Sequence, residues 1–323
     1  MNQIKKLNVA SSPHWKGGSS VSIVQKLWIV ALLPAIIASL WLFGLNSLRI
    51  LSLAIAFSVS IDALINRIVP SKDYTTNWSS VSLAVLFAFF MPLNAPWWII
   101  LIGCFIMIVI GKKLFGGIGA YPVHPVLLSC AMLHISWPQR FDYTASFVSM
   151  DWTSKMIEPL RYVKTLGGDV ATTFDWTNLL MGRQVAGIGN ALVLYLALGG
   201  IFLILIRQIT WHIPVAFLGG CFLMGLILHI VSPEQFATPL FYILSGGTIF
   251  GAFFLAPEYT TSPANRVPMF IYGFLGGVLL LLIRAFSVYS DGVIFAILLI
   301  NLCNPLIDRI TPKIYGLEEI KNA

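Results

Sequence analysis

The chain has 323 residues, of which 58% are hydrophobic and only 10% charged, with a formal net charge of +7 and a mean hydropathy of +0.85. A soluble globular domain is about 25% charged, so this composition excludes an ordinary soluble protein and indicates a polytopic membrane protein. The sequence has no C-x-x-C pair, phosphate-binding loop or nucleophile motif, which argues against an iron–sulfur site, a nucleotide-driven pump and a hydrolase. We predict no metal site and no catalytic residue.

The first 20 residues are polar and basic, and they lack the apolar core of a signal peptide, so we expect a cytoplasmic N-terminal segment over residues 1–24. About ten apolar segments follow, each near the length that a membrane-crossing helix needs. They cover residues 25–44, 48–66, 78–93, 97–112, 123–138, 188–207, 211–231, 239–256, 268–286 and 291–308. Pro, Gly and Ser interrupt the third, fifth and eighth segments.

The segments fall into two groups, 25–138 and 188–309, separated by a polar loop at 139–187 and followed by a tail at 310–323. FAFFMP closes the third segment and GAFFLAP the eighth, which suggests a repeat of five plus five helices. Because five is odd, the second copy would be inverted in the membrane. Most Lys and Arg residues lie on the side of the N-terminus, which predicts two cytoplasmic termini and places the 139–187 loop on the outer face. Those basic loops explain the positive charge without nucleic acid.

Asp62 is an acid inside a predicted span, with Asn66 on the same helical face. It would either relay an ion or bond a cofactor, or it would lie at the cytoplasmic interface, steadied by Arg67.

Two further clusters of small and hydroxyl residues are candidates for cofactor binding. LSGGTIFGAFF places small residues inside the eighth span, where they permit either close helix packing or contact with a flat ring. LAPEYTTSPANR follows with a hydroxyl-rich loop that fits a phosphate, a sugar-like chain or a simple capped turn. The candidates are Ser245, Gly246, Gly247, Thr260 and Thr261.

The outer loop contains GGDVATTFDWTNLL, with two adjacent threonines, Thr172 and Thr173. One interpretation is a polar turn in which Asp169 or the threonines cap a short helix that begins near Phe174. The other interpretation depends on a family resemblance.

Five stretches resemble the D subunit of the Rnf electron-transport complex, whose family is related to the B subunit of the sodium-pumping NADH:quinone oxidoreductase. They are residues 11–37, 115–128 (FGGIGAYPVHPVLL), 196–215, 239–263 (PLFYILSGGTIFGAFFLAPEYTTSP) and 292–309 (GVIFAILLINLCNPLIDR). Their order and spacing fit across nearly the whole chain.

The resemblance implies an integral subunit, in a bacterial or archaeal inner membrane, of a complex that couples electron transfer between ferredoxin and NAD to transport of Na⁺ or H⁺. It implies an inverted five-plus-five fold like that of urea and ammonium channels. It also implies partner subunits, including a flavin- or iron–sulfur-bearing neighbour, in addition to membrane lipid. Family members carry FMN joined through its phosphate to a threonine, and some also hold noncovalent riboflavin.

The family's threonine motif resembles D-G-x-S/T-G-A-T-P-L. Aligning its Ala-Thr with Ala171 and Thr172 matches Gly167 as well, but places Asp169 at the Ser/Thr position and Val170 at the second glycine. Thr172 is therefore the candidate for covalent FMN, with Thr173 as the fallback. Two hypotheses follow: a redox subunit that relays electrons through flavin, or a channel-like scaffold or small-solute permease that keeps the fold without covalent flavin.

Overall fold

A computed structural model describes residues 20–68, 78–141, 158–184 and 186–310. All regular structure in these ranges is helical, which confirms the predicted all-α class. The first half consists of α1 (Val21–Ile68), α2 (Trp78–Phe90), α3 (Trp97–Phe105), which continues as the π-helix η1 (Ile106–Lys113), and α4 (Pro125–Ser136).

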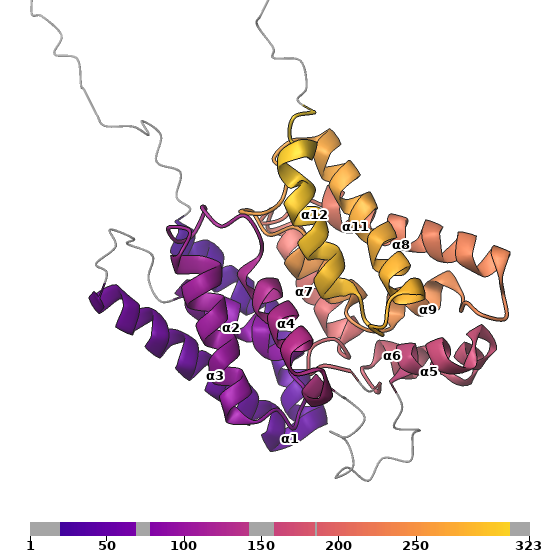
Figure 1. The fold of residues 1–323 in the computed structure, drawn as a ribbon, viewed down its shortest axis with the longest axis horizontal. Helices are drawn as coiled ribbons and strands as arrows, with labels where there is room; N and C mark the ends of the chain where they lie inside the picture. Colours follow the sequence, from indigo (N-terminus) through magenta and orange to yellow (C-terminus); the bar gives the residue numbers. More distant parts are fainter. Residues whose placement is uncertain (1–19, 69–77, 142–157, 185, 311–323) are drawn as a thin grey trace, which may run out of the picture.

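Short helices form the connecting region: η2 (Pro138–Phe141), α5 (Pro159–Leu166), η4 (Gly168–Thr173) and α6 (Trp176–Leu180). The second half consists of α7 (Val193–Leu205), α8 (His212–Val231), α9 (Pro239–Leu244), α10 (Thr248–Phe250), η5 (Gly251–Leu255), α11 (Arg266–Phe286) and α12 (Val293–Ile307). Helices α1–α4 and α8–α12 gather in different parts of the molecule, and α5 and α6 lie beside α9 (Figure 1).

Helix α1 is two predicted spans joined by a reversal. Its 48 residues are interrupted only at Gly44, which has φ 61° and ψ −144°. Across the reversal, the Ser47 hydroxyl donates to the Ser39 hydroxyl at 3.0 Å. A Cβ on Gly44 would meet nothing within 4 Å, so glycine is required here by backbone conformation and not by space.

Each of the other predicted spans coincides with a helical segment. The eighth is discontinuous: α9 ends at Leu244, and the chain resumes a helix only at Thr248. We call Ser245–Gly247 the break. Gly246 has φ 63°, a conformation that favours glycine, which explains why the helix ends at this sequence.

Three helices, α1, α8 and α11, are individually long and apolar enough to cross a membrane, and α2, α4, α7 and α12 are shorter apolar helices. Together with the composition, they make this a multi-pass membrane protein.

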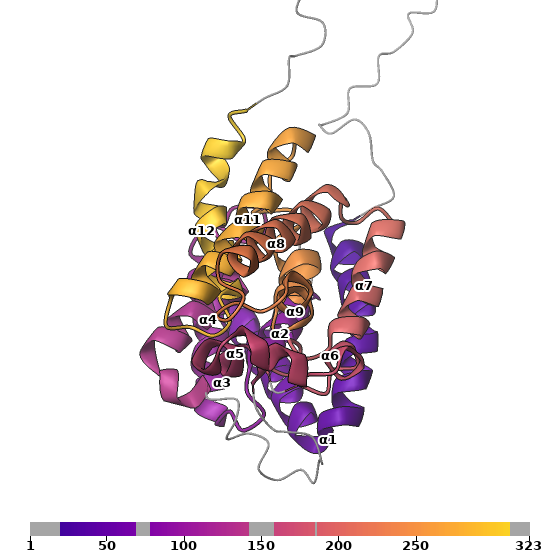
Figure 2. The ribbon, with the colours of Figure 1, turned by 90° about the vertical axis from the view of Figure 1, so that its right-hand side faces the viewer.

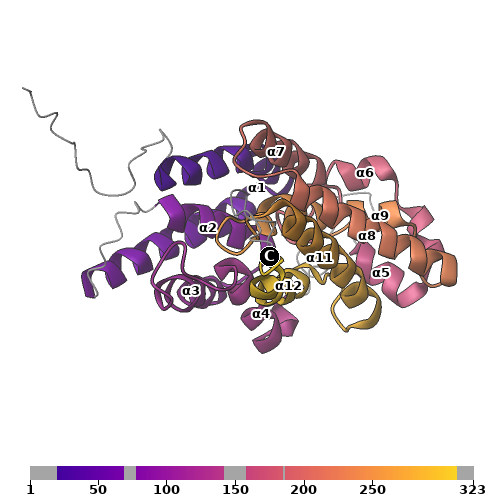
Figure 3. The ribbon, with the colours of Figure 1, turned by 90° about the horizontal axis from the view of Figure 1, so that it is seen from above.

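Close glycine contacts hold the second half together. Helices α8 and α11 lie side by side (Figure 3). A Cβ on Gly220 would come within 2.2 Å of the Phe274 carbonyl oxygen, and one on Gly277 within 2.0 Å of the Phe217 carbonyl oxygen. Small residues let membrane helices approach at backbone distance, so these glycines determine the separation of the two helices. Helix α7 packs on α1 and joins the two halves (Figure 2).

Candidate functional site

The two candidate threonines lie on the surface of the connecting region. Thr172 and Thr173 are both exposed, in the 3₁₀ helix η4. Their hydroxyls donate to the carbonyl oxygens of Asp169 and Val170, each at 2.7 Å. These local bonds orient both side chains while leaving them accessible from outside the fold.

The structure does not bear out the capping interpretation. The short helix α6 begins at Trp176, and its N-cap is Asp175, whose side chain makes no cap hydrogen bond. Asp169 and the two threonines belong to η4 instead. The rings of Tyr162 and Phe241 flank Phe174 at about 6 Å, so this residue anchors the loop rather than starting a helix.

Two glycines fix η4 against the turn between α8 and α9. The Gly168 amide donates to the Glu234 carbonyl at 2.7 Å. Gly167 has φ 101°, and a Cβ on it would lie 2.6 Å from the same oxygen. A Cβ on Gly168 would lie 2.5 Å from the Phe236 carbonyl oxygen. The backbone of the threonine-bearing loop is therefore in direct contact with the backbone of the turn between α8 and α9.

An ion pair fills the break. Arg284, in the last turn of α11, donates through Nη2 to Asp291 Oδ1 at 2.8 Å. Its Nη1 donates to the Tyr242 carbonyl at 2.7 Å, and Nη2 also reaches the Ser245 carbonyl at 3.3 Å. Asp291 Oδ2 accepts from the Gly247 amide at 2.7 Å. The guanidinium thus binds carbonyls at the end of α9, and the carboxylate binds the amide where α10 begins.

The small residues of the break make room for this pair. A Cβ on Gly246 would lie 2.6 Å from Leu160 Cδ1 and 2.9 Å from Asp291 Oδ2. One on Gly247 would lie 3.0 Å from Asn190 Oδ1. The space beside the predicted ring-binding glycines is occupied by side chains of the chain itself.

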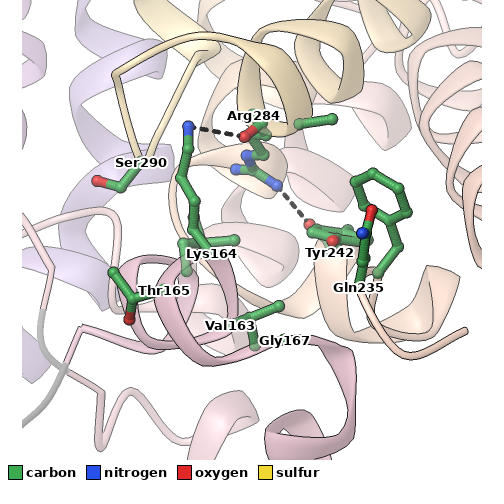
Figure 4. Close-up of a pocket in the computed structure, with 11 residues that line it drawn as sticks. Val163, Lys164, Thr165, Gly167, Gln235, Tyr242, Arg284 and Ser290 are labelled. Atoms are coloured by element: carbon green, nitrogen blue, oxygen red, sulfur yellow. Dashed lines mark hydrogen bonds between the residues drawn. The ribbon is translucent and has the colours of Figure 1, made fainter. Parts of the chain in front are cut away.

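A cavity of about 330 Å³ lies between α5, α9 and the end of α11 (Figure 4). Among its lining residues are Val163, Lys164, Gln235, Tyr242, Arg284 and Ser290. Lys164 Nζ donates to the carbonyl oxygens of Arg284 and Tyr289, each at 2.9 Å, and to that of Ser287. Partial burial lowers the pKa of the Lys164 ammonium from its ordinary value, while Glu158 opposes the change.

Thr260 and Thr261 lie at the other end of α10 and η5, about eight helical residues from the break. Their amides donate to Glu258 Oε2 at 3.1 Å, and Tyr121 Oη donates to Glu258 Oε1 at 2.8 Å. Burial raises the pKa of the Glu258 carboxyl despite these hydrogen bonds. The five predicted residues therefore form two separate groups, Ser245–Gly247 at the break and Thr260–Thr261 beside Glu258.

Asp62 is almost fully buried and belongs to a charged cluster. Its carboxylate lies 3.6 Å from Lys112 Nζ and 3.3 Å from Lys113 Nζ. Ser80 donates to it at 2.8 Å, and Lys113 also bonds Asn66 at 2.6 Å. The cations that steady this acid are therefore the two lysines at the end of η1, rather than the expected arginine at the end of α1.

Sequence reasoning missed Arg284, Asp291 and Lys164. Arg284 and Asp291 carried a visible signal, because each is a charged residue at the edge of a predicted span, whereas Lys164 lies in the middle of the polar loop and carried none. The arginine and the lysine were counted only as loop charges, and nothing in the sequence pairs residues 164, 284 and 291.

Comparison with known proteins identifies relatives along the whole chain. The model of the NQR2, RnfD, RnfE family matches residues 8–316. The D subunit of the Na⁺-translocating ferredoxin:NAD⁺ oxidoreductase complex of Acetobacterium woodii is 35% identical, over 99% of this chain and 98% of that protein. The D subunits of the ion-translocating oxidoreductase complexes of Vibrio cholerae and Salmonella newport are 34% and 33% identical, each over 95% of this chain and 99% and 98% of their own lengths. The chain therefore belongs to the NQR2, RnfD, RnfE family.

Proposed function

We propose that this protein is the D subunit of an Rnf-type complex, in which electron transfer between ferredoxin and NAD drives Na⁺ or H⁺ across the membrane. The observation that carries the proposal is similarity over nearly the full length of both chains to relatives named as such subunits. The partners would be the other membrane and peripheral subunits of the complex, including one that carries a flavin or an iron–sulfur centre.

Thr172 is the proposed attachment point for FMN, with Thr173 as the alternative. Its hydroxyl is exposed and held by a single backbone carbonyl, so it is accessible to a modifying enzyme without unfolding of η4. A flavin attached there would supply one- and two-electron redox chemistry. The chain itself would hold that flavin at a fixed place, because Gly167 and Gly168 tie η4 to the turn between α8 and α9.

The two remaining groups are the candidates for a noncovalent flavin, usually riboflavin in the family. Around Gly246 and Gly247 the space is filled by Arg284, Asp291 and Leu160, so Ser245–Gly247 offer no room for a ring in this arrangement. Thr260 and Thr261 donate hydrogen bonds to Glu258, and the cavity lined by Glu258 and Tyr121 is only about 20 Å³. A second flavin at either group would therefore require these side chains to rearrange.

Ten crossings in an inverted arrangement, with both termini cytoplasmic, remain part of the proposal. Two observations support it. The two arms of α1 supply the first two spans on either side of Gly44. Each half also has a buried cation at the end of its fourth predicted span, Lys112 in η1 and Arg284 in α11. Each cation bonds the start of the third predicted span of its own half, at Ser79 in α2 and Tyr242 in α9.

A flavin-depleted scaffold or small-solute permease is the second candidate, favoured by the departure of Asp169 and Val170 from the flavin motif. Intact mass of the purified chain separates the two functions. We expect a gain of one FMN phosphoester, in-gel flavin fluorescence, and loss of both in Thr172→Ala but not in Thr173→Ala. An unmodified mass in the wild-type chain, with no flavin co-purifying, would support the scaffold.

A test of the complex completes the assignment. Membranes lacking this protein should lose ferredoxin-dependent NAD reduction together with ion uptake, and the wild-type chain should restore both. Restored electron transfer without any ion uptake would contradict the proposed coupling.

A further inference from the structure

The break is closed by charges that match its two helix ends. Carbonyl oxygens at the end of a helix carry partial negative charge, and amides at the start of a helix carry partial positive charge. Arg284 binds the carbonyls of Tyr242 and Ser245, and Asp291 binds the Gly247 amide. The ion pair therefore supplies the counter-charges for both ends of the discontinuous span.

Both members of the pair belong to one short connection. Arg284 is in the last turn of α11, and Asp291 lies just before α12, so residues 284–291 carry the cation at one end and the anion at the other. A change in the conformation of this connection changes the distance between the two charges. The geometry of the break thus depends on the connection between α11 and α12.

Helix α5 is hydrogen-bonded to this connection at two points. At its start, Glu158 Oε1 accepts from the Ser290 hydroxyl. In its last turn, Lys164 donates to the carbonyl oxygens of Arg284, Ser287 and Tyr289. These three carbonyls span most of the connection, so a displacement of α5 moves both ends of it together. Figure 4 shows the bond from Lys164 to Arg284.

The threonine-bearing loop continues directly from α5. Gly167 joins α5 to η4, in which Thr172 lies, and its neighbour Gly168 is bonded to the body of the second half. Leu160 of α5 also lies against Gly246 in the break. A continuous series of contacts therefore runs from η4, through α5 and the α11–α12 connection, to the discontinuous span.

We propose that Lys164, Arg284 and Asp291 form a positioning link through which the threonine-bearing loop controls the conformation of the break. Its role in coupling electron transfer to ion movement rests on the proposed function, whereas the link itself rests on the contacts above. Because Lys164 bonds the α11–α12 connection, removing its ammonium loosens the break indirectly, through the two charges that the connection carries.

Hydrogen–deuterium exchange of the purified full chain tests the link. Lys164→Met removes three hydrogen bonds from a surface position. We expect amides of residues 245–250 to exchange at least about tenfold faster than in the wild-type chain, because their protection depends on the charge pair. Thr165→Val is the matched control: the Thr165 hydroxyl bonds carbonyls of α5 itself, so its loss should affect α5 alone. Ser290→Ala, which removes the second attachment, should act in the same direction as Lys164→Met.

Wild-type exchange at 245–250 in both Lys164→Met and Ser290→Ala, with α5 loosened, would overturn the proposal. In the assembled complex, Lys164→Met should retain flavin mass and electron transfer but move fewer ions per electron. Absence of flavin from the wild-type chain would refute the proposed function while leaving the exchange result intact, so the two failures are distinguishable.

Discussion

Neutralising Asp291 tests whether the break depends on charge. Arg284 is only 4% exposed, and in Asp291→Asn its guanidinium keeps its carbonyl partners but loses its anion. Breaking a buried ion pair on one side costs about 3–5 kcal/mol, because the remaining charge is left uncompensated. The Gly247 amide also loses a charged acceptor in favour of a weaker neutral one. We expect a fall in apparent melting temperature of at least roughly 5 °C.

The measurement is thermal unfolding of the detergent-solubilised chain, followed by tryptophan fluorescence at a fixed heating rate. Arg284→Met combined with Asp291→Asn should be less destabilising than the sum of the single variants, since the double variant leaves no member of this pair charged and unpaired. The exchanged pair, Arg284→Asp with Asp291→Arg, should not recover stability, because each charge then faces the wrong helix end. A melting temperature within about 1 °C of wild type for Asp291→Asn would refute the reasoning.

Three further variants test other elements, each by the same unfolding measurement. Gly44→Ala should destabilise the fold by about 1–3 kcal/mol, because a φ of 61° is strained for any residue with a side chain. Gly219→Ala, in open space on α8, should be neutral or slightly stabilising, and equal effects of the two variants would contradict a conformational role for Gly44. Gly277→Ala should cost roughly 3 kcal/mol, since its Cβ would meet the Phe217 carbonyl at 2.0 Å, and a wild-type melting curve would show that α8 and α11 separate without penalty. Asp62→Asn, which leaves Lys112 buried without this anion, should cost about 3–5 kcal/mol, while the exposed Asp169→Asn should stay within about 0.5 kcal/mol; similar small losses in both would mean that the cluster around Asp62 is not a stabilising ion pair.

The helical segments were predictable because each is a run of apolar residues close to the length that a membrane-crossing helix needs. The division between the first two spans fell at 45–47, and the structure places the reversal at Gly44. The break in the eighth span was visible only as an interruption by Ser and Gly. Its place at Ser245–Gly247 depends on Arg284 and Asp291, which are distant in sequence and whose pairing no periodicity encodes.

The candidate site was predictable as a set of residues but not as an arrangement. Thr172 was identified from its loop and the family motif, and its exposure on η4 agrees with an accessible hydroxyl. Ser245 and Thr261 were predicted in two consecutive clusters, and α10 and η5 separate the two clusters in the structure. Separation along a helix follows from its geometry, but which neighbours fill the space at each end follows from tertiary packing.

The tight reversal at Gly44 bears on how the chain enters the membrane during synthesis. The two arms of α1 are joined by a short turn, and Trp41 and Leu45 beside it are each 81% exposed and apolar. In the proposed orientation, Asn46, Ser47 and Arg49 are the polar residues that would cross the bilayer with this turn, and the Arg49 side chain is satisfied by the carbonyls of Leu93 and Ala95 once the first half is assembled. The two arms can therefore enter the membrane as one helical hairpin, and the Arg49 side chain gains its hydrogen-bond acceptors later, when the segment around Leu93 and Ala95 folds against it.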